Sequence, residues 1–593
     1  MPILDTFIKK QNFASYEDFY ENFKVEIPDN FNFAFDVMDT LAREKPNDAA
    51  LVWCDERGAE SSFSYAELMR LSNQAAAVLR GAGIGKGDPV MLVLKRRWEY
   101  WIVLLALHKL RAVAIPATHL LSPKDIVYRC KAAGVTGIIC VDEPIMQRID
   151  EAEAKLRSEG YAAVRFKAFI RSVHNTGHTL PAPDSAAVTP WIDLHSLLRL
   201  DRTKPFEFAR PADAESADAA ANDDIMLLYF TSGTTGMPKM VSHNFVYPLG
   251  HIITAKYWQQ VEEGGLHLTV ADTGWAKAAW GKMYGQWLCG SAVFVYDYDR
   301  FVPPAMLDVI TRYRVTSFCA PPTVYRFFIK ENLARYDFSY LKHCSVAGEP
   351  LNPEIYEQWK AGTGLQLREA YGQTELTVAI CSFPWFAPKP GSMGKPSPWY
   401  DISLVRDDGS PCDMGEEGQL VVRTGKKKPV GIFGGYYRDE ELTRGVWRDD
   451  VYYTGDMAWQ DEDGYLWFVG RADDLIKSSG YRIGPFEVES ALMEHPAVLE
   501  CAITGVPDPD RGAVVKATII LTKGYEPSNA LKTELQEHVK KITAPYKYPR
   551  IIEFVSELPK TISGKIRRVQ IREEREEREE REKMVKGSVP CVR

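Results

Sequence analysis

A strand followed directly by a loop of glycine, serine and threonine is the feature that most restricts the fold of this chain. Residues 225–230 form the apolar run IMLLYF, which predicts a buried strand, and residues 229–239 read YFTSGTTGMPK. Glycine lets the backbone approach an anion, and successive N–H groups in such a turn bind phosphate. The GxxxxGK[ST] spacing of a Walker A loop is missing. We therefore expect a polyphosphate loop of another kind rather than a flexible linker.

Composition limits the class of protein. The chain has 593 residues, more than one hydrophobic core accommodates, so several domains are expected. Its net charge of −8 gives no electrostatic case for binding nucleic acid. Its ten cysteines form no CxxC pair, which favours a reducing compartment over a disulfide framework or a zinc site. No apolar run is long enough to span a bilayer, and the first residues resemble neither a signal peptide nor a transit peptide. We expect a cytoplasmic protein with no membrane span.

The order of apolar patterns predicts an α/β fold with several parts. A helix at 64–81, a strand at 89–94 and a helix at 98–109 alternate as in a doubly wound sheet, and a second α/β stretch covers residues 266–379. A solvated connector over residues 200–224 leads into the phosphate strand. Short alternating strands rich in glycine and proline at 385–467 suit a small β-barrel or ribbon. A compact α+β region follows, with helices at 485–493 and 529–542 and strands at 499–504 and 514–522.

These patterns divide the chain into three regions. We predict a large N-terminal domain at 1–472, built from two doubly wound α/β subdomains and the small β-barrel. A small mobile α+β domain is predicted at 473–570, and a charged tail at 571–593. The tail repeats Glu-Glu-Arg, which places opposite charges three and four residues apart and predicts a solvated helix or a frayed extension.

Five further motifs follow the phosphate loop in a fixed order. They are GEP at 348–350, YGQTE at 371–375, YYTGD at 452–456, GRADDLIKSSGYRIGPFEVE at 470–489 and PKTISGKIRR at 559–568. Together they resemble the adenylate-forming superfamily of acyl-CoA synthetases, peptide-synthetase adenylation domains and luciferases, over residues 31–568. FNFAFDVMDTLA at 31–42 and ADTGWAKAAWGKMYG at 271–285 resemble the AMP-forming medium-chain acyl-CoA synthetases within it.

The resemblance implies a ligase that works in two half-reactions. A carboxylate and ATP give an acyl-adenylate and pyrophosphate, and attack by the CoA thiol then gives acyl-CoA and AMP. ATP, Mg²⁺ and coenzyme A are the implied cofactors, a small carboxylic acid is the substrate, and a homodimer is compatible with the resemblance. One alternative is an adenylation enzyme that loads a carrier protein, although no carrier segment follows. The other is a non-catalytic nucleotide-binding protein, which the presence of Lys565, Glu375 and Asp456 argues against.

The resemblance also assigns nucleotide and catalytic roles. Glu375 is the metal ligand, since a carboxylate beside phosphates requires a cation between them. Thr374 contacts the α-phosphate, and Lys565, on the mobile domain, stabilises the charge that develops there. Asp456 accepts the ribose hydroxyls; without the resemblance, it could equally be a salt-bridged surface residue. The expected ATP-binding residues are Thr231, Ser232, Gly233, Thr234, Thr235, Gly236, Met237, Pro238, Lys239, Gly348, Glu349, Pro350, Glu369, Ala370, Tyr371, Gly372, Gln373, Thr374, Asp456, Arg471, Arg482 and Lys565.

The second half-reaction is assigned in the same way. Asp473 resembles the hinge about which the small domain rotates, which removes Lys565 from the site and brings in a loop at 478–482. The solvated face of a helix remains the alternative for Lys540. The expected CoA-binding residues are Ser479, Gly480, Tyr481, Arg511, Lys540 and Tyr548.

Gly372 is predicted to set the size of the acid. The acetate-specific branch of the family has tryptophan at the matching position, so a glycine predicts an open channel for a longer or branched acyl group. Lys277 is unusual in an apolar segment, and either faces CoA or phosphate or is solvated. The bulky neighbours favour short- to medium-chain, branched or cyclic acids. The expected acyl-pocket residues are Trp258, Trp275, Lys277, Trp280, Cys319 and Gly372.

Overall fold

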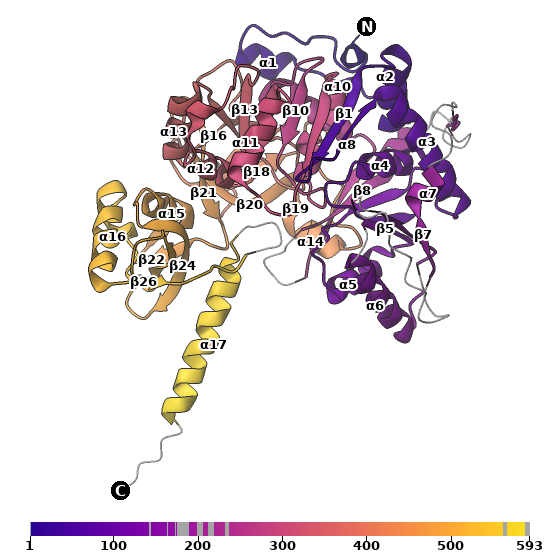
Figure 1. The fold of residues 1–593 in the computed structure, drawn as a ribbon. Helices are drawn as coiled ribbons and strands as arrows, with labels where there is room; N and C mark the ends of the chain where they lie inside the picture. The colour runs from indigo at the N-terminus through magenta and orange to yellow at the C-terminus, as the bar shows by residue number, and fades with distance from the viewer. Residues whose placement is uncertain are drawn as a thin grey trace. The chain divides into compact units, whose positions relative to one another are not determined.

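The computed structural model divides the chain into two compact units (Figure 1). The first unit takes the chain up to Asp401 together with Thr424–Asp449, and the second takes Ile402–Arg423 and the chain from Asp450 onward. No helix among the described residues is long and apolar enough to cross a membrane. The connector predicted at 200–224 lies largely outside the described residues, which are 2–141, 144–162, 164–171, 174, 189–198, 206–210, 219–231, 237–560 and 566–587.

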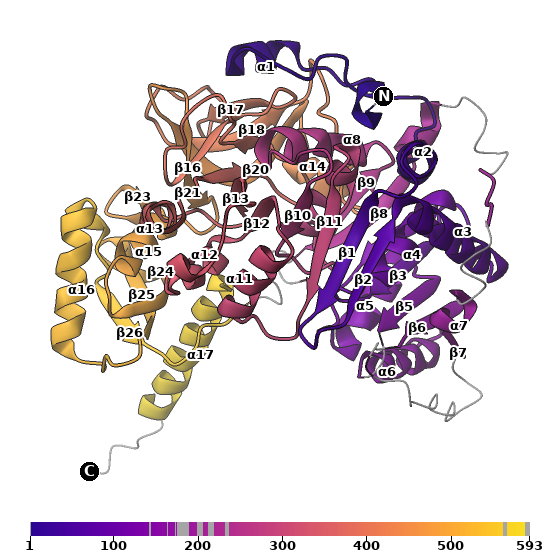
Figure 2. The ribbon, with the colours of Figure 1, turned by 45° about the horizontal axis from the view of Figure 1, so that its top comes forward.

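The first sheet of unit 1 has the strand order β7-β6-β5-β3-β4-β8-β9. All neighbours are parallel except the β8–β9 pair. Strands β3, β5 and β6 are buried along their whole length, as expected where helices cover both faces. Figures 1 and 2 show α3 and α4 on one side and α5 and α6 on the other. The strands are β3 (Pro89–Val93), β4 (Val113–Pro116), β5 (Gly137–Val141), β6 (Phe166–Ile170), β7 (Trp191–Asp193), β8 (Ile225–Thr231) and β9 (Lys239–Asn244).

The helices around this sheet begin where the sequence supplies caps. Ser64 and Glu67 form a reciprocal capping box at the start of α3, and Ser122 with Asp125 does the same for α5. Gly134 ends α5 in the left-handed conformation that glycine favours. The predicted helices at 64–81 and 98–109 are confirmed. The helices are α1 (Tyr16–Asn22), α2 (Asp39–Glu44), α3 (Tyr65–Gly81), α4 (Glu99–Lys109), α5 (Pro123–Ala133), α6 (Ile145–Ser158) and α7 (Leu194–Leu198).

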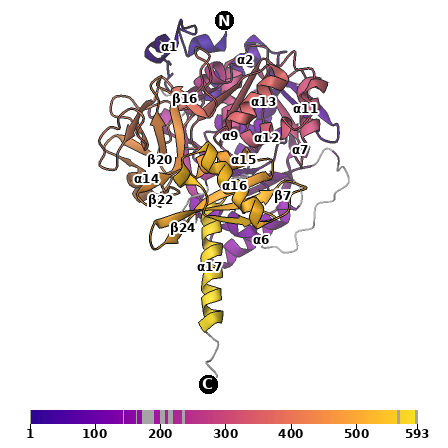
Figure 3. The same ribbon diagram turned by 90° about the vertical axis from the view of Figure 1, so that its left-hand side faces the viewer.

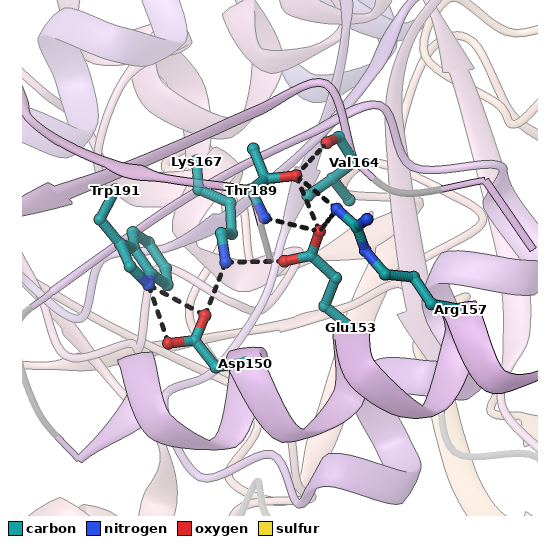
Figure 4. Close-up of polar contacts among 7 residues, drawn as sticks. All are labelled: Asp150, Glu153, Arg157, Val164, Lys167, Thr189 and Trp191. Atoms are coloured by element: carbon teal, nitrogen blue, oxygen red, sulfur yellow. Dashed lines mark hydrogen bonds and ion pairs between the residues drawn. The ribbon is translucent and has the colours of Figure 1, made fainter. Parts of the chain in front are cut away.

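A buried ion network fastens the edge of this sheet (Figure 4). The fully buried Lys167 of β6 donates to Asp150 at 2.6 Å and to Glu153 at 2.7 Å, both on α6. The hydroxyl of Thr189 donates to Glu153 at 2.7 Å, and the indole of Trp191 donates to Asp150 at 2.9 Å. The network therefore joins α6, β6 and β7 through side chains rather than through the sheet ladder.

The second sheet of unit 1 runs in the order β16-β15-β14-β13-β12-β10-β11-β1-β2. The strands from β14 to β1 are parallel, and β2, β15 and β16 are antiparallel. Leu268, Phe294, Phe318 and Trp359 lie at the centre of its core. The strands are β1 (Ala49–Asp55), β2 (Glu60–Ser64), β10 (Leu266–Thr269), β11 (Ala292–Asp297), β12 (Ser317–Ala320), β13 (His343–Ala347), β14 (Leu367–Tyr371), β15 (Ile380–Cys381) and β16 (Ser392–Pro396).

The remaining elements of unit 1 include a π-helical turn, η5 (Ile253–Trp258), that directly follows α8. A short strand, β19 (Trp447–Arg448), follows α14. The helices are α8 (Tyr247–Ile252), α9 (Lys277–Gly281), α10 (Tyr284–Leu288), α11 (Pro303–Arg312), α12 (Pro322–Phe328), α13 (Pro353–Thr363) and α14 (Glu440–Val446).

Unit 2 begins with an antiparallel sheet in the order β17-β18-β20-β21. The short strands predicted for residues 385–467 are present, but they form an open sheet, so of the two predicted arrangements the barrel is wrong and the ribbon is closer. Periodicity identifies strands but does not say which edges pair. The strands are β17 (Asp401–Val405), β18 (Gly418–Arg423), β20 (Val451–Gln460) and β21 (Leu466–Arg471).

The C-terminal part of unit 2 is a small sheet with helices on both faces. Helices α15 (Pro485–Met493) and α16 (Asn529–Ile542) share one hydrophobic core with Ile503 and Ile519, and Figure 3 shows both in front of the sheet. Strand residues that alternate with these, Ala502 and Ile520, face Ile571 of α17 (Arg568–Gly587) on the other side. The strands of this sheet are β24 (Val498–Asp508), β25 (Gly512–Leu521) and β26 (Ile551–Phe554), and a separate two-stranded sheet pairs β22 (Ile476–Ser478) with β23 (Tyr481–Ile483).

Helix α17 contains the Glu-Glu-Arg repeat, and its first turns are docked rather than solvated. Arg568 makes a bidentate ion pair with Glu489, and Arg572 donates to Asp474 at 2.9 Å. Arg575 is 8% exposed and donates to the backbone oxygen of Gly505. The predicted helix is present, but its arginines hold it against the small domain.

Candidate active site

The phosphate loop joins two antiparallel strands. Thr231 at the end of β8 pairs with Lys239 at the start of β9, and we call this antiparallel pair the phosphate hairpin. The ammonium group of Lys239 lies 5.2 Å from the centre of the Tyr436 ring. Ser232, Gly233, Thr234, Thr235 and Gly236 lie outside the described residues.

A buried histidine fixes the YGQTE segment beside this hairpin. The Nε2 atom of His243, on β9, lies 2.7 Å from the backbone oxygen of Thr374. Burial lowers the pKa of His243 to about 4, although the carbonyl of Thr374 raises it. The imidazole is therefore neutral at pH 7, and the proton that this bond needs lies on Nε2, because a carbonyl only accepts. The phosphate hairpin and the expected α-phosphate contact are thus held together.

Glu375, the expected metal ligand, accepts a hydrogen bond from the Tyr436 hydroxyl at 2.9 Å. Its backbone oxygen accepts the N–H of Phe433 at 2.8 Å. Tyr436 thus contacts both Lys239 and Glu375, and the sequence analysis missed it. The available signal was the string GIFGGYY at 431–437, in which Gly431 and Gly435 have φ of 90° and 128°, angles that favour glycine.

Two neighbouring parallel strands carry the GEP and YGQTE motifs to one edge of the sheet. Ala347 at the end of β13 pairs with Ala370 near the end of β14. Gly348 has φ of 108°, a conformation suited to glycine. Lys277 donates to the backbone oxygen of Ala347 at 2.5 Å, and the Thr323 hydroxyl donates to Glu349 at 3.0 Å. Lys277 is therefore half-buried beside the GEP loop.

Glu369 is a buried acid inside the expected adenine segment. One of its oxygens accepts the N–H of Leu351 at 3.1 Å, and the other has no hydrogen-bond partner among the described residues. Burial raises the pKa of Glu369 to about 8, against the lowering effect of the bond from Leu351. The carboxyl group is therefore largely protonated at pH 7 and can donate as well as accept.

The space next to Gly372 is filled, which contradicts the predicted open channel. The indole of Trp280 packs on Gly372, so that a Cβ at this position would lie 2.8 Å from its Cζ2 atom and nearer still to Cη2. The indole of Trp258 stands perpendicular to that of Trp280, with ring centres 6.1 Å apart, and donates to the backbone oxygen of Arg368 at 2.9 Å. Three of the expected pocket residues thus meet, but a tryptophan 92 positions away closes the gap that the glycine leaves.

The other expected pocket residues lie on neighbouring elements. Trp275 precedes α9, and its backbone oxygen accepts the N–H of Ala278 at 2.9 Å. Cys319 is 1% exposed on β12, so its thiol is buried.

In unit 2, the expected ribose and hinge residues form a chain of contacts. Asp456 on β20 is opposite Arg471 on β21, and the two side chains are 3.4 Å apart. Arg471 also lies 3.4 Å from Asp473, an exposed residue between β21 and β22. Asp474 is held by Arg572 of α17. The hinge candidate is therefore flanked by two arginine contacts.

The expected CoA loop is a tight hairpin turn between β22 and β23. Ser479 and Gly480 have φ of 50° and 84°, the pair of positive angles that a type I′ turn requires. Arg511 accepts the N–H of Ser479 with its backbone oxygen at 2.8 Å and approaches the Ser479 hydroxyl at 3.3 Å. Tyr481 is half exposed and stacks on Tyr546, with ring centres 4.1 Å apart. Tyr546 is a second residue that the sequence analysis missed.

The remaining predicted residues of unit 2 are in two places. The ammonium of Lys540 lies 4.3 Å from the ring centre of Tyr548, which joins these two CoA candidates. Arg482, expected at the nucleotide, instead donates to Asp407 at 2.7 Å. Lys565 lies outside the described residues.

A cavity of about 350 Å³ lies in unit 1 where several parallel strands end. Lys95 follows β3, Val141 ends β5, and Asp297 ends β11. Strands β4 and β5 flank β3 on opposite sides, so the chain order reverses here, and such switch points are common ligand sites. Its basic groups include Lys95 and Arg148, and the sequence analysis did not identify it.

Family models place these elements in a class of enzyme. Residues 38–437 match the family described as AMP-binding enzyme, and residues 487–565 match the AMP-binding enzyme C-terminal domain. The chain therefore belongs to the AMP-binding enzyme family, which confirms the predicted adenylate-forming class.

Relatives and solved structures agree with this family assignment. The chain is 40% identical to mitochondrial acyl-coenzyme A synthetase ACSM3 of Mus musculus, over 95% of this chain and 94% of that protein. It is 42% identical to mitochondrial ACSM5 of Homo sapiens, over 92% and 91%. The crystal structure of the anthranilate CoA ligase AuaEII is similar with a TM-score of 0.79 and 27% identity, over 92% of this chain and 98% of that one.

These comparisons confirm three predictions and contradict a fourth. The α/β fold with a large N-terminal and a small C-terminal domain, the acyl-CoA synthetase activity and the classification as a ligase are confirmed. The cytoplasmic location is wrong, because the relatives that share 40–42% identity are named as mitochondrial enzymes.

Proposed function

We propose that this enzyme activates a short- to medium-chain, branched or cyclic carboxylic acid as its adenylate and transfers the acyl group to CoA. The observation that carries the proposal is the joining of the phosphate hairpin to the YGQTE loop. Tyr436 links Lys239 to Glu375, and His243 holds Thr374. These contacts bring together Lys239, Thr374 and Glu375, whose cation, hydroxyl and carboxylate are the groups proposed to bind the triphosphate.

The residues present fit Mg²⁺ held mainly by substrate. No group of three or more metal-ligating side chains lies together in the described part of the chain. Mg²⁺ usually binds through one or two carboxylates together with phosphate oxygens and water. Glu375 is the carboxylate for that role, and Tyr436 orients it. When bound, the metal neutralises charge on the triphosphate.

This chain's own residues then position the reacting groups. Thr374 is proposed to hold the α-phosphate, and Lys565 to stabilise the negative charge that grows there as the carboxylate attacks. The protonated Glu369 holds Leu351 and with it the GEP loop that borders the nucleoside. Asp456 and Arg471 are proposed to bind ribose. Pyrophosphate leaves, and the acyl-adenylate remains.

The thioester step is proposed to use a second arrangement about Asp473. The turn at Ser479 and Gly480 faces pantetheine, and Arg511 stiffens the turn. Lys540 and Tyr548, whose ammonium group and ring centre are 4.3 Å apart, are proposed to hold the nucleotide end of CoA together with Arg511.

The acid class rests on the tryptophan pair. Trp258 and Trp280 meet above Gly372, so the free volume is limited. The relatives are named as acyl-coenzyme A synthetases, and a similar solved structure is that of a benzoate CoA ligase from Burkholderia xenovorans, at 26% identity and a TM-score of 0.75 over 91% of this chain and 100% of that one. Both support a pocket for acids of moderate size.

The test is acid-dependent ATP–pyrophosphate exchange over a panel of straight, branched and aromatic acids, followed by acyl-CoA formation. We expect exchange with several acids and thioester with free CoA. Exchange without transfer to CoA, but with transfer to a pantetheinylated carrier protein, would favour the carrier-loading alternative. Absence of exchange with every acid would refute the ligase proposal.

A further inference from the structure

An aromatic arm at the N-terminus packs directly behind the acyl-pocket candidates. Phe13, Phe19 and Phe23 surround the ring of Tyr257, with ring centres 5.9, 4.5 and 5.5 Å from it. Phe19 is fully buried and Phe23 is 3% exposed, so these rings form part of the core of unit 1. The arm comprises residues 11–23 and includes α1, which is visible near the N-terminus in Figure 1.

Hydrogen bonds fix the arm in this position. The Tyr257 hydroxyl donates to the backbone oxygen of Gln11 at 3.0 Å. The indole of Trp385 donates to the backbone oxygen of Phe13 at 3.1 Å, and the ring of Phe19 lies 4.7 Å from that of Trp385. The backbone of the arm and its aromatic rings therefore contact the same two side chains, Tyr257 and Trp385.

Tyr257 transmits this contact to the pocket through its neighbour. Tyr257 and Trp258 are the last two residues of the π-helical turn η5, and such turns are frequent at functional sites. Adjacent residues of a helical turn point in different directions, so one can face the arm while the other faces the pocket. Trp258 contacts Trp280, which packs on Gly372.

We propose that the arm is a specificity-determining element, which sets the depth of the acyl pocket by holding Tyr257 and thereby Trp258. This inference rests on the proposed acyl pocket. Residues 11–23 precede the stretch matched by the family model, which begins at residue 38, so the arm adds to the shared domain. Phe19 acts here as a positioning residue, because it touches Tyr257 and not the acyl group.

The test compares matched variants in acid-dependent pyrophosphate exchange. Phe19→Leu keeps an apolar side chain but removes the ring against Tyr257, so Trp258 gains room to retreat. We expect kcat/KM for acids one or two methylenes longer than the best wild-type acid to rise about tenfold relative to that acid, since a methylene in a pocket is worth about 10–200-fold. The KM for ATP should not change.

Phe294→Leu is the control. Phe294 is also fully buried, and its ring lies 4.7 Å from that of Tyr313, in the hydrophobic cluster that contains Trp359. It should lose stability without changing the acid profile. If Phe19→Leu does not fold, Tyr257→Phe, which removes only the bond to Gln11, should shift the profile in the same direction.

The outcomes separate the arm from the pocket. An unchanged acid profile in folded Phe19→Leu, or an equal shift in Phe294→Leu, would overturn the role of the arm while leaving the ligase proposal intact. Wild-type protein that shows no exchange with any acid would overturn both proposals.

Discussion

Replacing Gly372 by alanine should damage the acyl site even though it adds one methyl group. The new Cβ would lie 2.8 Å from Cζ2 of Trp280 and nearer still to Cη2. The backbone oxygen of Thr377 would be as near to the new Cβ as Cη2 is. Real Cβ atoms essentially never come within 3.0 Å of a neighbour. The indole can shift, but the carbonyl belongs to the backbone, and the N–H of Thr377 is already bonded to the Tyr400 hydroxyl at 3.0 Å. Overpacking of this kind costs about 1–3 kcal/mol.

A double-mutant cycle with Trp280→Ala measures how much of that cost is the indole. Trp280→Ala alone should reduce the free energy of unfolding by about 3–5 kcal/mol and extend the acid range toward longer chains. In the double variant, the clash with the ring is gone and the clash with Thr377 remains. We expect a coupling energy of about 0.5–3 kcal/mol in urea unfolding, because residues in contact couple by this amount. The same variants are assayed for kcat/KM over straight-chain acids.

Two results would refute this reasoning. One is a Gly372→Ala variant with wild-type unfolding free energy and wild-type acid preference, which would mean that Trp280 does not press on Gly372. The other is strict additivity of the two substitutions. The same geometry bears on Gly372→Trp. An indole at 372 would compete for space with the indole of Trp280, so we expect loss of folding or of all acid activation rather than a new preference for acetate.

Three further substitutions test the proposed roles and the ion network. Lys565→Ala should abolish acid-dependent pyrophosphate exchange yet largely spare thioester formation from supplied acyl-adenylate; equal loss of both would count against its role. Asp473→Pro should adenylate normally but make no acyl-CoA, because proline fixes φ near −65°; normal overall turnover would show that the pivot lies elsewhere. Burial raises the pKa of Glu153, but bonds from Lys167, Thr189 and Arg157 outweigh it and leave the pKa below 4.5. Its stabilisation is thus present above that pH and lost as pH falls through the lowered pKa. Lys167→Met should cost about 3–5 kcal/mol in urea at pH 7 and less at pH 4; the same cost at both pH values would contradict this.

The sequence was most informative where the signal is local. The helix predicted at 485–493 is α15 with the same bounds, because a proline at its first position and an apolar face are written in adjacent residues. The strands expected at 385–467 do not close into a barrel, because β17 and β21 are not paired. Whether two such edges pair depends on residues far apart in the chain, which local patterns do not reveal. Trp280 was expected in the same pocket as Gly372, but the packing of its indole on the glycine was not, because a contact between positions so distant leaves no mark on either motif.

The candidate site follows the same rule. Motifs such as YGQTE can be recognised from their sequence, whereas the role of Tyr436 depends on the contact of its hydroxyl with Glu375 in the folded chain. The burial that raises the pKa of Glu369 to about 8 is likewise a property of the packed sheet rather than of the letters EAYGQTE.

The three-residue period of the Glu-Glu-Arg repeat determines which arginines of α17 face the small domain. Three residues advance about 300° around a helix of 3.6 residues per turn, so each arginine sits about 60° behind the previous one. Side-chain exposure follows this rotation: 27% at Arg572, 10% at Arg575, 59% at Arg578 and 76% at Arg581. The arginine stripe therefore crosses the docking face once and then turns to solvent. The period of the repeat thus decides which arginines reach the docking face, and one inserted residue would rotate every arginine after it by about 100°.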